Sequence, residues 1–175
     1  TLSLSSAASD VYKRQGPITN LIGLAQGLSF LGIVRLSGKL FNSNENPLLA
    51  GAVAVAYGTA VVGLMFTLTP TFIANGFYQG TMSADMVTDL GFALNFTQFL
   101  IGALWVSQVV RADSGQLPSW GRNVGNAQAY GSAAVLLAFY FGAIGEALFV
   151  PALVLFGIVL YPLFIFGLFK AFAKQ

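Results

Sequence analysis

Five apolar runs of membrane-spanning length constrain this chain more than any other feature. A helix needs ~20 apolar residues to cross the ~30 Å hydrocarbon core of a bilayer, where every backbone polar group must be paired within the protein. None of the runs shows the alternation of apolar and polar residues that marks a membrane β-strand. The sequence therefore predicts an all-α fold, a polytopic transmembrane bundle in one domain, residues 16–175. Its five spans cover residues 17–34, 48–72, 86–110, 126–148 and 151–172.

The composition supports this prediction. Hydrophobic residues make up 56% of the chain and charged residues 8%, with a net charge of +2. A water-soluble domain carries about 25% charged residues, so this chain has too little charge to cover an aqueous surface. We expect an integral membrane protein with the lipid bilayer as its partner. The small net charge, with no dense basic stripe, predicts no nucleic-acid partner.

The absence of cysteine and histidine removes most catalytic chemistry. It excludes Cys/His zinc sites, histidine-ligated haem, thiol nucleophiles and Ser-His-Asp triads. No acid-base pair is visible within the apolar runs. We therefore expect no enzyme, no metal and no cofactor.

The N-terminal segment Thr1 to Gln15 has a different origin from the remainder of the chain in our interpretation. Residues 5–15 read SSAASDVYKRQ, which matches the in-frame translation of a common sequencing adapter. We treat residues 1–15 as an artefact and not as native protein. The native form is then expected to begin upstream, with at least six spans.

Basic residues predict the orientation, because cytoplasmic loops are enriched in Lys and Arg. Beyond residue 15 the basic residues fall only in alternate loops: Arg35, Lys39, Arg111, Arg122, Lys170 and Lys174. The intervening loops and the adjoining span ends carry acidic residues instead: Asp85, Asp89 and Glu146. We expect the C-terminus to be cytoplasmic, in a prokaryotic plasma (inner) membrane.

Small residues and a proline predict how the spans pack. Gly23 and Gly27 form a small-xxx-small pair in the first span, which lets another backbone approach closely. Pro162 lies at the centre of the fifth span, where it removes one backbone hydrogen bond. A kink at Pro162 is the expected result.

The third span carries a polar stripe on one helical face. Gly91, Asn95, Gln98, Gly102 and Trp105 follow spacings of four, three, four and three, which place them on one side of a helix. A carboxamide in hydrocarbon needs hydrogen-bond partners, so this face should point into the bundle.

Two interpretations of the mid-membrane polar groups remain open. In the first, they are interhelical contacts in a small membrane component that acts through helix packing and assembly into a homo- or hetero-oligomer. In the second, they line a pathway for a small solute or ion in a transporter or permeation protein. The candidate residues for either role are Gln26, Asn95, Gln98, Thr97, Tyr57 and Tyr130.

A short internal match suggests a repeat. Residues 56–60 read AYGTA and residues 129–133 read AYGSA, in two spans that run in the same direction. Parallel repeats of this kind occur in transporters, but short matches between spans rich in Ala and Gly also arise by coincidence.

Overall fold

The computed structural model describes residues 24–25, 27–74 and 99–174. This part of the chain forms helices and short connections without any strand, and the predicted all-α class is confirmed. Two helices cover residues 27–40 and 99–112 and are named here by these ranges. The others are the 3-10 helix η1 (Ser43–Glu45), α2 (Pro47–Ala74), α4 (Ser119–Tyr140), α5 (Glu146–Leu153), the π-helix η2 (Val154–Leu160) and α6 (Tyr161–Phe172).

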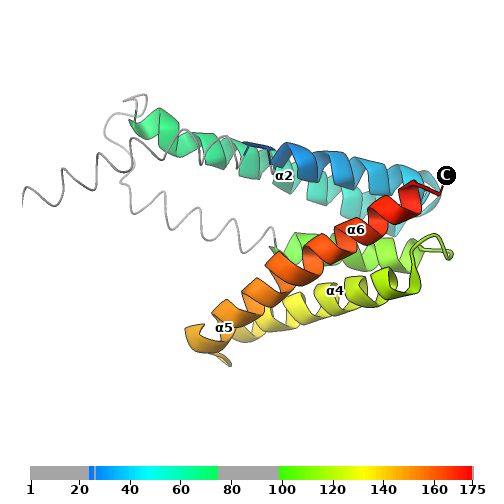
Figure 1. Ribbon diagram of the computed structural model, residues 1–175. Coiled ribbons are helices and arrows are strands. Elements are labelled where there is room, and N and C mark those ends of the chain that lie inside the picture. Colours follow the sequence, from blue (N-terminus) through cyan, green and yellow to red (C-terminus); the bar gives the residue numbers. More distant parts are fainter. Residues whose placement is uncertain (1–23, 26, 75–98, 175) are drawn as a thin grey trace, which may run out of the picture.

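The helices alternate in direction along the bundle (Figure 1). Helices 27–40 and 99–112 and the α5–η2–α6 path run toward the end where the C-terminus lies, whereas α2 and α4 run away from it. The connections 41–46 and 113–118 therefore share this end with the C-terminus, and the turn 141–145 lies at the opposite end. We call the end that holds the C-terminus and these two connections the basic end.

Two predicted boundaries at the basic end are wrong. The first helix was expected to stop at residue 34, yet it continues to Leu40 and carries Arg35 and Lys39 on its last turns. It stops before Asn42, whose left-handed backbone (φ 48°) is incompatible with a continuing helix. The α4 helix begins at Ser119 and not near residue 126, directly after the extended Pro118.

The turn between α4 and α5 corrects the predicted fourth span, 126–148. Helix α4 ends at Tyr140 because Gly142 adopts φ 69°, the left-handed position at which glycine commonly ends a helix. The Ala143 N–H donates to the Ala138 carbonyl at 2.7 Å and closes the turn. The next helix starts at Glu146, which the prediction had placed in the fourth span.

The main core lies toward the basic end and is centred on Trp105, which is fully buried. Its indole packs edge-to-face against Phe30 (centroids 5.7 Å apart) and Phe164 (6.1 Å). Helices 27–40, 99–112 and α6 are thereby joined through one side chain. The core also takes apolar residues from these three helices, from α2 and α4 and from the connections: Val34, Leu40, Phe41, Leu49, Ala56, Val106, Val109, Val110, Leu117, Ala129, Ile165, Leu168 and Ala171.

Glycines set the close approach of α4 to α6 and η2. A Cβ added at Gly125 would lie 2.7 Å from Val110 Cγ2 and 2.8 Å from Phe164 Cδ2. One turn toward the basic end, a Cβ at Gly121 would lie 3.5 Å from the Cα of Gly167. Helix α4 thus presents a small-residue face to its neighbours, which lets backbones approach closely.

We expect Gly125→Ala to lower the free energy of unfolding by about 1–3 kcal/mol, because its methyl group must displace buried side chains on two neighbouring helices. The matched control is Gly32→Ala, since a Cβ at Gly32 has no described atom within 4 Å. That change should be neutral or stabilise by up to about 1 kcal/mol, the usual gain for alanine over glycine in a helix. Urea unfolding in detergent micelles measures both, and equal effects would contradict the packing described here.

The proline of the last helical path is accommodated by the seven-residue π-helix that precedes it. Pro162 has no N–H and would crowd the carbonyl four residues back. In η2 the backbone widens, and the Tyr161 N–H bonds to the Phe156 carbonyl five residues earlier. The π-helix thus accommodates Pro162, and the predicted kink at this residue stays a prediction.

One helical path among the described residues is long and apolar enough to cross a membrane. It covers Ala147–Phe172, 26 residues, and only 11% of its most apolar stretch is buried in the bundle. Two shorter apolar helices cover Pro47–Val62 and Phe99–Ala112. The long path is therefore not a buried core helix of the bundle.

Candidate functional site

Most of the predicted polar site lies outside the described residues. This holds for the carboxamides and Thr97 and for two of the predicted packing glycines: Gln26, Asn95, Gln98, Thr97, Gly23 and Gly91. Their predicted roles stay predictions. At the end of the same stripe, Gly102 has no described atom within 4 Å of an added Cβ, whereas Trp105 is fully buried.

The two predicted tyrosines lie on exposed faces of different helices. Tyr57 of α2 is 42% exposed and lines an open pocket with Arg35. Tyr130 of α4 is 53% exposed, and its hydroxyl accepts a hydrogen bond from Arg111 Nη2 at 3.3 Å. Tyr130 therefore has a basic hydrogen-bond partner, whereas Tyr57 shares the lining of a pocket with Arg35.

The two similar segments, residues 56–60 and 129–133, contain the same type of local hydrogen bond. The Thr59 hydroxyl donates to the Ala56 carbonyl at 2.9 Å, and the Ser132 hydroxyl donates to the Ala129 carbonyl at 3.3 Å. Both alanines are buried. Such bonds to the carbonyl three or four residues earlier are common for Ser and Thr in helices, so they do not establish a repeat.

Of the predicted packing glycines, Gly27 faces a neighbouring helix. A Cβ at Gly27 would overlap the Leu64 side chain of α2. A glycine here therefore allows helix 27–40 to approach α2. Its predicted partner in the small-xxx-small pair, Gly23, is not described.

Trp105 also forms a buried hydrogen bond that the sequence did not suggest. Its Nε1–H donates to Ser37 Oγ at 3.0 Å, and the Ser37 hydroxyl donates in turn to the Val34 carbonyl at 2.7 Å. Ser37 is 1% exposed. Helices 27–40 and 99–112 are thus fixed in register by a polar contact inside an apolar core.

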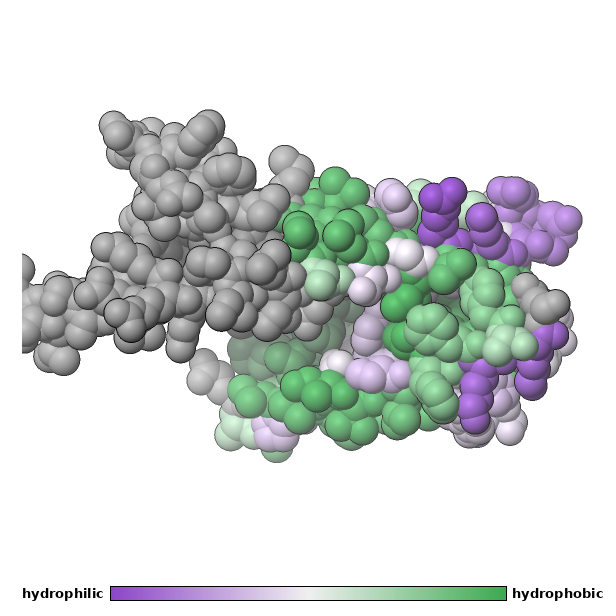
Figure 2. All heavy atoms as spheres, turned by 45° about the horizontal axis from the view of Figure 1, so that its top comes forward, coloured by the Kyte–Doolittle hydropathy of each residue, from purple (hydrophilic) through white to green (hydrophobic). Residues whose placement is uncertain are grey.

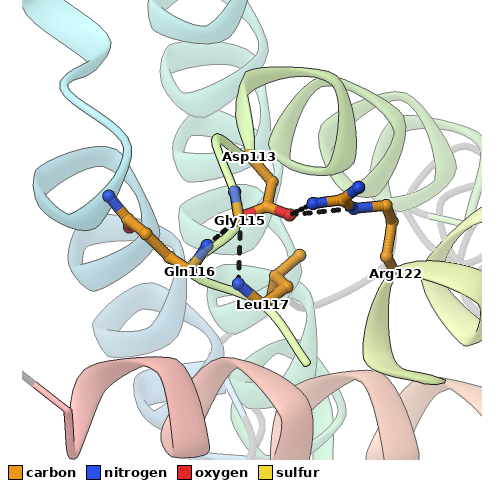
Figure 3. Close-up of polar contacts among 5 residues, drawn as sticks. All are labelled: Asp113, Gly115, Gln116, Leu117 and Arg122. Atoms are coloured by element: carbon orange, nitrogen blue, oxygen red, sulfur yellow. Dashed lines mark hydrogen bonds and ion pairs between the residues drawn. The ribbon is translucent and has the colours of Figure 1, made fainter. Parts of the chain in front are cut away.

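Among the described residues, the most densely bonded polar group is Asp113, in the connection between helix 99–112 and α4 (Figure 3). Its Oδ1 accepts hydrogen bonds from the backbone N–H groups of Gly115 (3.1 Å), Gln116 (2.8 Å) and Leu117 (2.9 Å). Its Oδ2 accepts from Arg122 Nε at 2.9 Å and from Nη2 of the same guanidinium. The Asp113 side chain is fully buried by this arrangement, whereas that of Arg122 is 43% exposed.

Two opposing effects act on the pKa of Asp113. Burial alone would raise it, since a buried carboxylate loses its hydration. The backbone N–H donors and the Arg122 guanidinium favour the charged form and outweigh burial, so the pKa lies below the ordinary 3.8. Asp113 is therefore a charged residue that organises the connection.

Three buried polar atoms have no hydrogen-bond partner among the described residues: Gln116 Oε1, Gln128 Oε1 and the Tyr161 hydroxyl. Gln128 is 2% exposed. It lies between Gly125, which faces Phe164, and Gly131, which faces Phe156. Gln128 was not predicted, although the rule that selected Gln26 and Gln98, a carboxamide within an apolar run, applies to it equally.

Two open pockets lie at the basic end. The larger, about 520 Å³, is formed by helix 27–40, the connection around η1 and α2. The smaller, about 260 Å³, lies between the connections 41–46 and 113–118. Asn42 and Glu45 line both pockets and separate them.

In the part of the chain that the structure describes, no three His, Cys, Asp or Glu residues lie close enough together to hold a metal ion. Comparison with protein-family models, curated proteins and solved structures finds no match to this chain.

Proposed function

We propose that this chain is a multi-pass component of a prokaryotic plasma membrane that acts through helix packing and assembly with other subunits. The observation that carries the proposal is the separation of apolar and basic surface along the bundle. On the face that Figure 2 shows, hydrophilic residues gather at the basic end and the described surface beyond them is mainly apolar.

The exposed face of the last helical path supports a lipid environment. Its large side chains lie open along most of its length: Leu155, Ile158, Val159, Leu163, Phe166 and Phe169. Soluble monomers rarely expose a continuous apolar patch of this kind. In a bilayer the same face is in contact with acyl chains, where its exposure carries no cost.

Aromatic and basic residues at the basic end support anchoring at a membrane surface. Trp120 and Phe166 stack with ring centroids 6.1 Å apart, and the Lys170 ammonium lies 5.0 Å from the Phe166 ring. Such groups are enriched at the membrane–water interface. In our proposal the basic end faces the cytoplasm and the five predicted spans correspond to the five helical paths of the bundle.

An exposed stripe on α2 supports assembly. Large and small residues alternate along it at spacings of three and four: Leu48, Gly51, Val55, Gly58 and Val62. A Cβ at Gly51 or Gly58 has no described atom within 4 Å. Small residues in such a stripe allow a second helix to approach closely.

Cysteine labelling tests the proposal. Because the chain contains no cysteine, each variant carries a single reactive thiol. The informative variants are Ser114→Cys in the connection at the basic end, Ala143→Cys in the opposite turn, and Ile158→Cys on the exposed apolar face. In intact cells a membrane-impermeant maleimide should label only Ala143→Cys. Permeabilisation should add Ser114→Cys, whereas Ile158→Cys should stay unlabelled because lipid covers it.

The same series tests assembly. Val55→Cys, at the centre of the α2 stripe, should form an interchain disulfide under mild oxidation in membranes, and Ile158→Cys serves as the matched control. Labelling of all three positions in intact cells would disprove membrane insertion. If the labelling is as expected but Val55→Cys forms no cross-link, membrane insertion stands and only assembly through the α2 stripe is disproved.

A second candidate function is permeation of a small solute or ion. The buried Gln128 Oε1 and Tyr161 hydroxyl, unpartnered among the described residues, favour it, and the predicted residues Gln26, Asn95 and Gln98 would extend the same pathway. Solute flux into proteoliposomes that Gln128→Leu abolishes would favour permeation over assembly.

A further inference from the structure

The larger pocket at the basic end is built from three elements. Arg35, Gly38 and Lys39 come from helix 27–40, and Val53 and Tyr57 come from α2. The connection that includes η1 closes the third side with Asn42, Ser43, Asn44 and Glu45. The pocket has a volume of about 520 Å³ and opens to the surface. This is enough space for a phosphate group and the group esterified to it.

The shape of the pocket depends on a close contact between its walls. A Cβ at Gly38 would lie 3.3 Å from Ser43 Oγ and 3.5 Å from Val53 Cγ1. Glycine here lets the connection lie directly against the helix. The left-handed Asn42 (φ 48°) turns the chain so that Ser43 and Asn44 line the opening.

The charge of the pocket is positive. Arg35 and Lys39 are four residues apart on one helical face and both are exposed. Among the described residues neither has a carboxylate within 4.0 Å, since the ion pair found there joins Arg122 to Asp113. Glu45 is the one acidic residue of the lining, so two cations face a single anion.

The other basic residues near this end mostly have partners. Arg122 is held by Asp113, Arg111 bonds to Tyr130, and Lys170 lies over the Trp120 and Phe166 rings. Among the described residues, Arg35 and Lys39 are therefore two neighbouring cations whose charge remains available to a ligand. A guanidinium, an ammonium and a tyrosine that line one pocket are suited to a phosphate group.

The surface beyond the pocket is suited to a lipid and not only to free phosphate. Toward the opposite end, Leu28 and Gly32 continue the exposed face of Arg35, and Val61 continues that of Tyr57. These residues form an apolar strip along which an acyl chain can lie. Free phosphate would make no use of such a strip.

We propose that the pocket of Arg35, Lys39 and Tyr57 binds the phosphate group of an anionic membrane lipid, with an acyl chain along Leu28, Gly32 and Val61. The inference rests on the proposed membrane function. Basic pockets at the cytoplasmic side of helix bundles bind anionic headgroups in this way. The bound lipid would hold helix 27–40 against α2 and connect this face of the bundle to the inner leaflet.

The test is a lipid titration of the purified full chain in neutral detergent, followed by native mass spectrometry, with phosphatidylglycerol and phosphatidylcholine as probes. Phosphatidylglycerol should bind at least tenfold more tightly than phosphatidylcholine. Arg35→Gln/Lys39→Gln should weaken phosphatidylglycerol binding about 25-fold, since each basic residue contributes roughly fivefold. Tyr57→Phe, which keeps the charge, should weaken it by a smaller factor.

The matched control is Lys170→Gln/Lys174→Gln, which removes the same charge at the same end but outside the pocket. It should leave phosphatidylglycerol affinity within about twofold of the parent. An equal loss in the control, or equal binding of the two lipids, would overturn the inference. Competition by millimolar inorganic phosphate would assign the pocket to free phosphate instead of lipid.

The cysteine labelling separates this inference from the proposed function. If Ser114→Cys and Ala143→Cys label as expected and phosphatidylglycerol shows no preference, only the lipid site is wrong. If the labelling shows no membrane insertion, both are wrong. Urea unfolding of each variant shows whether a loss of binding reflects a loss of fold.

Discussion

Trp105→Ala is expected to lower the free energy of unfolding by about 3–5 kcal/mol, the usual cost of removing a large aromatic side chain from a core. Trp105 is fully buried and packs edge-to-face on Phe30 and Phe164, so the cavity would open between three helices. The substitution also removes the donor to Ser37 Oγ. Urea or SDS unfolding in micelles, followed by circular dichroism, measures the effect.

Two variants separate the contributions at this site. Trp105→Phe keeps an aromatic ring but loses the hydrogen bond to Ser37, and we expect a loss of about 1–2 kcal/mol. Trp120→Ala removes the other tryptophan, which is 36% exposed, and should cost less than Trp105→Ala. Equal losses for the two alanine variants would mean that Trp105 is not the centre of the core.

Asp113→Ala is expected to lower the free energy of unfolding by about 3 kcal/mol. Removing the carboxylate leaves three backbone N–H groups without their acceptor and separates Arg122 from its partner. Arg122 is partly exposed and can be hydrated, so the loss should fall at the lower end of the range for a broken buried ion pair. The connection 113–118 would lose its ordered conformation and would no longer fix helix 99–112 and α4 relative to each other.

The pH dependence of stability gives an independent test. Because the pKa of Asp113 is lower in the folded protein than the ordinary 3.8, its contribution is complete above about pH 4 and is lost as the pH falls through the folded value. The parent should lose stability in this acidic range. Asp113→Asn should be less stable than the parent at pH 7 and should show a weaker dependence below pH 4. A parallel decline in both proteins would show that other groups carry the acid sensitivity.

Local signals in the sequence predicted part of this structure correctly. The apolar runs predicted helices because their length and lack of alternation fit no strand, and the all-α class is confirmed. Basic residues in alternate loops predicted helices of alternating direction, and the connections 41–46 and 113–118 lie at the same end as the C-terminus (Figure 1). Asp113 followed by Ser-Gly is also a recognisable turn sequence, although its role was not predicted.

Helix boundaries required the structure. The extent of helix 27–40 depends on the left-handed Asn42, and the end of α4 depends on the positive φ of Gly142. Hydropathy does not contain this information, because Arg35 and Lys39 are polar and still lie on a helix. Prediction therefore placed both residues in a loop, whereas the structure places them on the wall of a pocket.

What the sequence by itself determined is the arrangement of apolar and charged surface, because burial from water depends on residue type and on spacing along the chain. Only the tertiary structure decided which residues meet. Ser37 and Trp105 are 68 positions apart, and Gly125 meets Phe164 across a helix–helix contact. Such pairs depend on how helices cross and on the few ångströms that a glycine leaves open, and no local pattern in the chain encodes those distances.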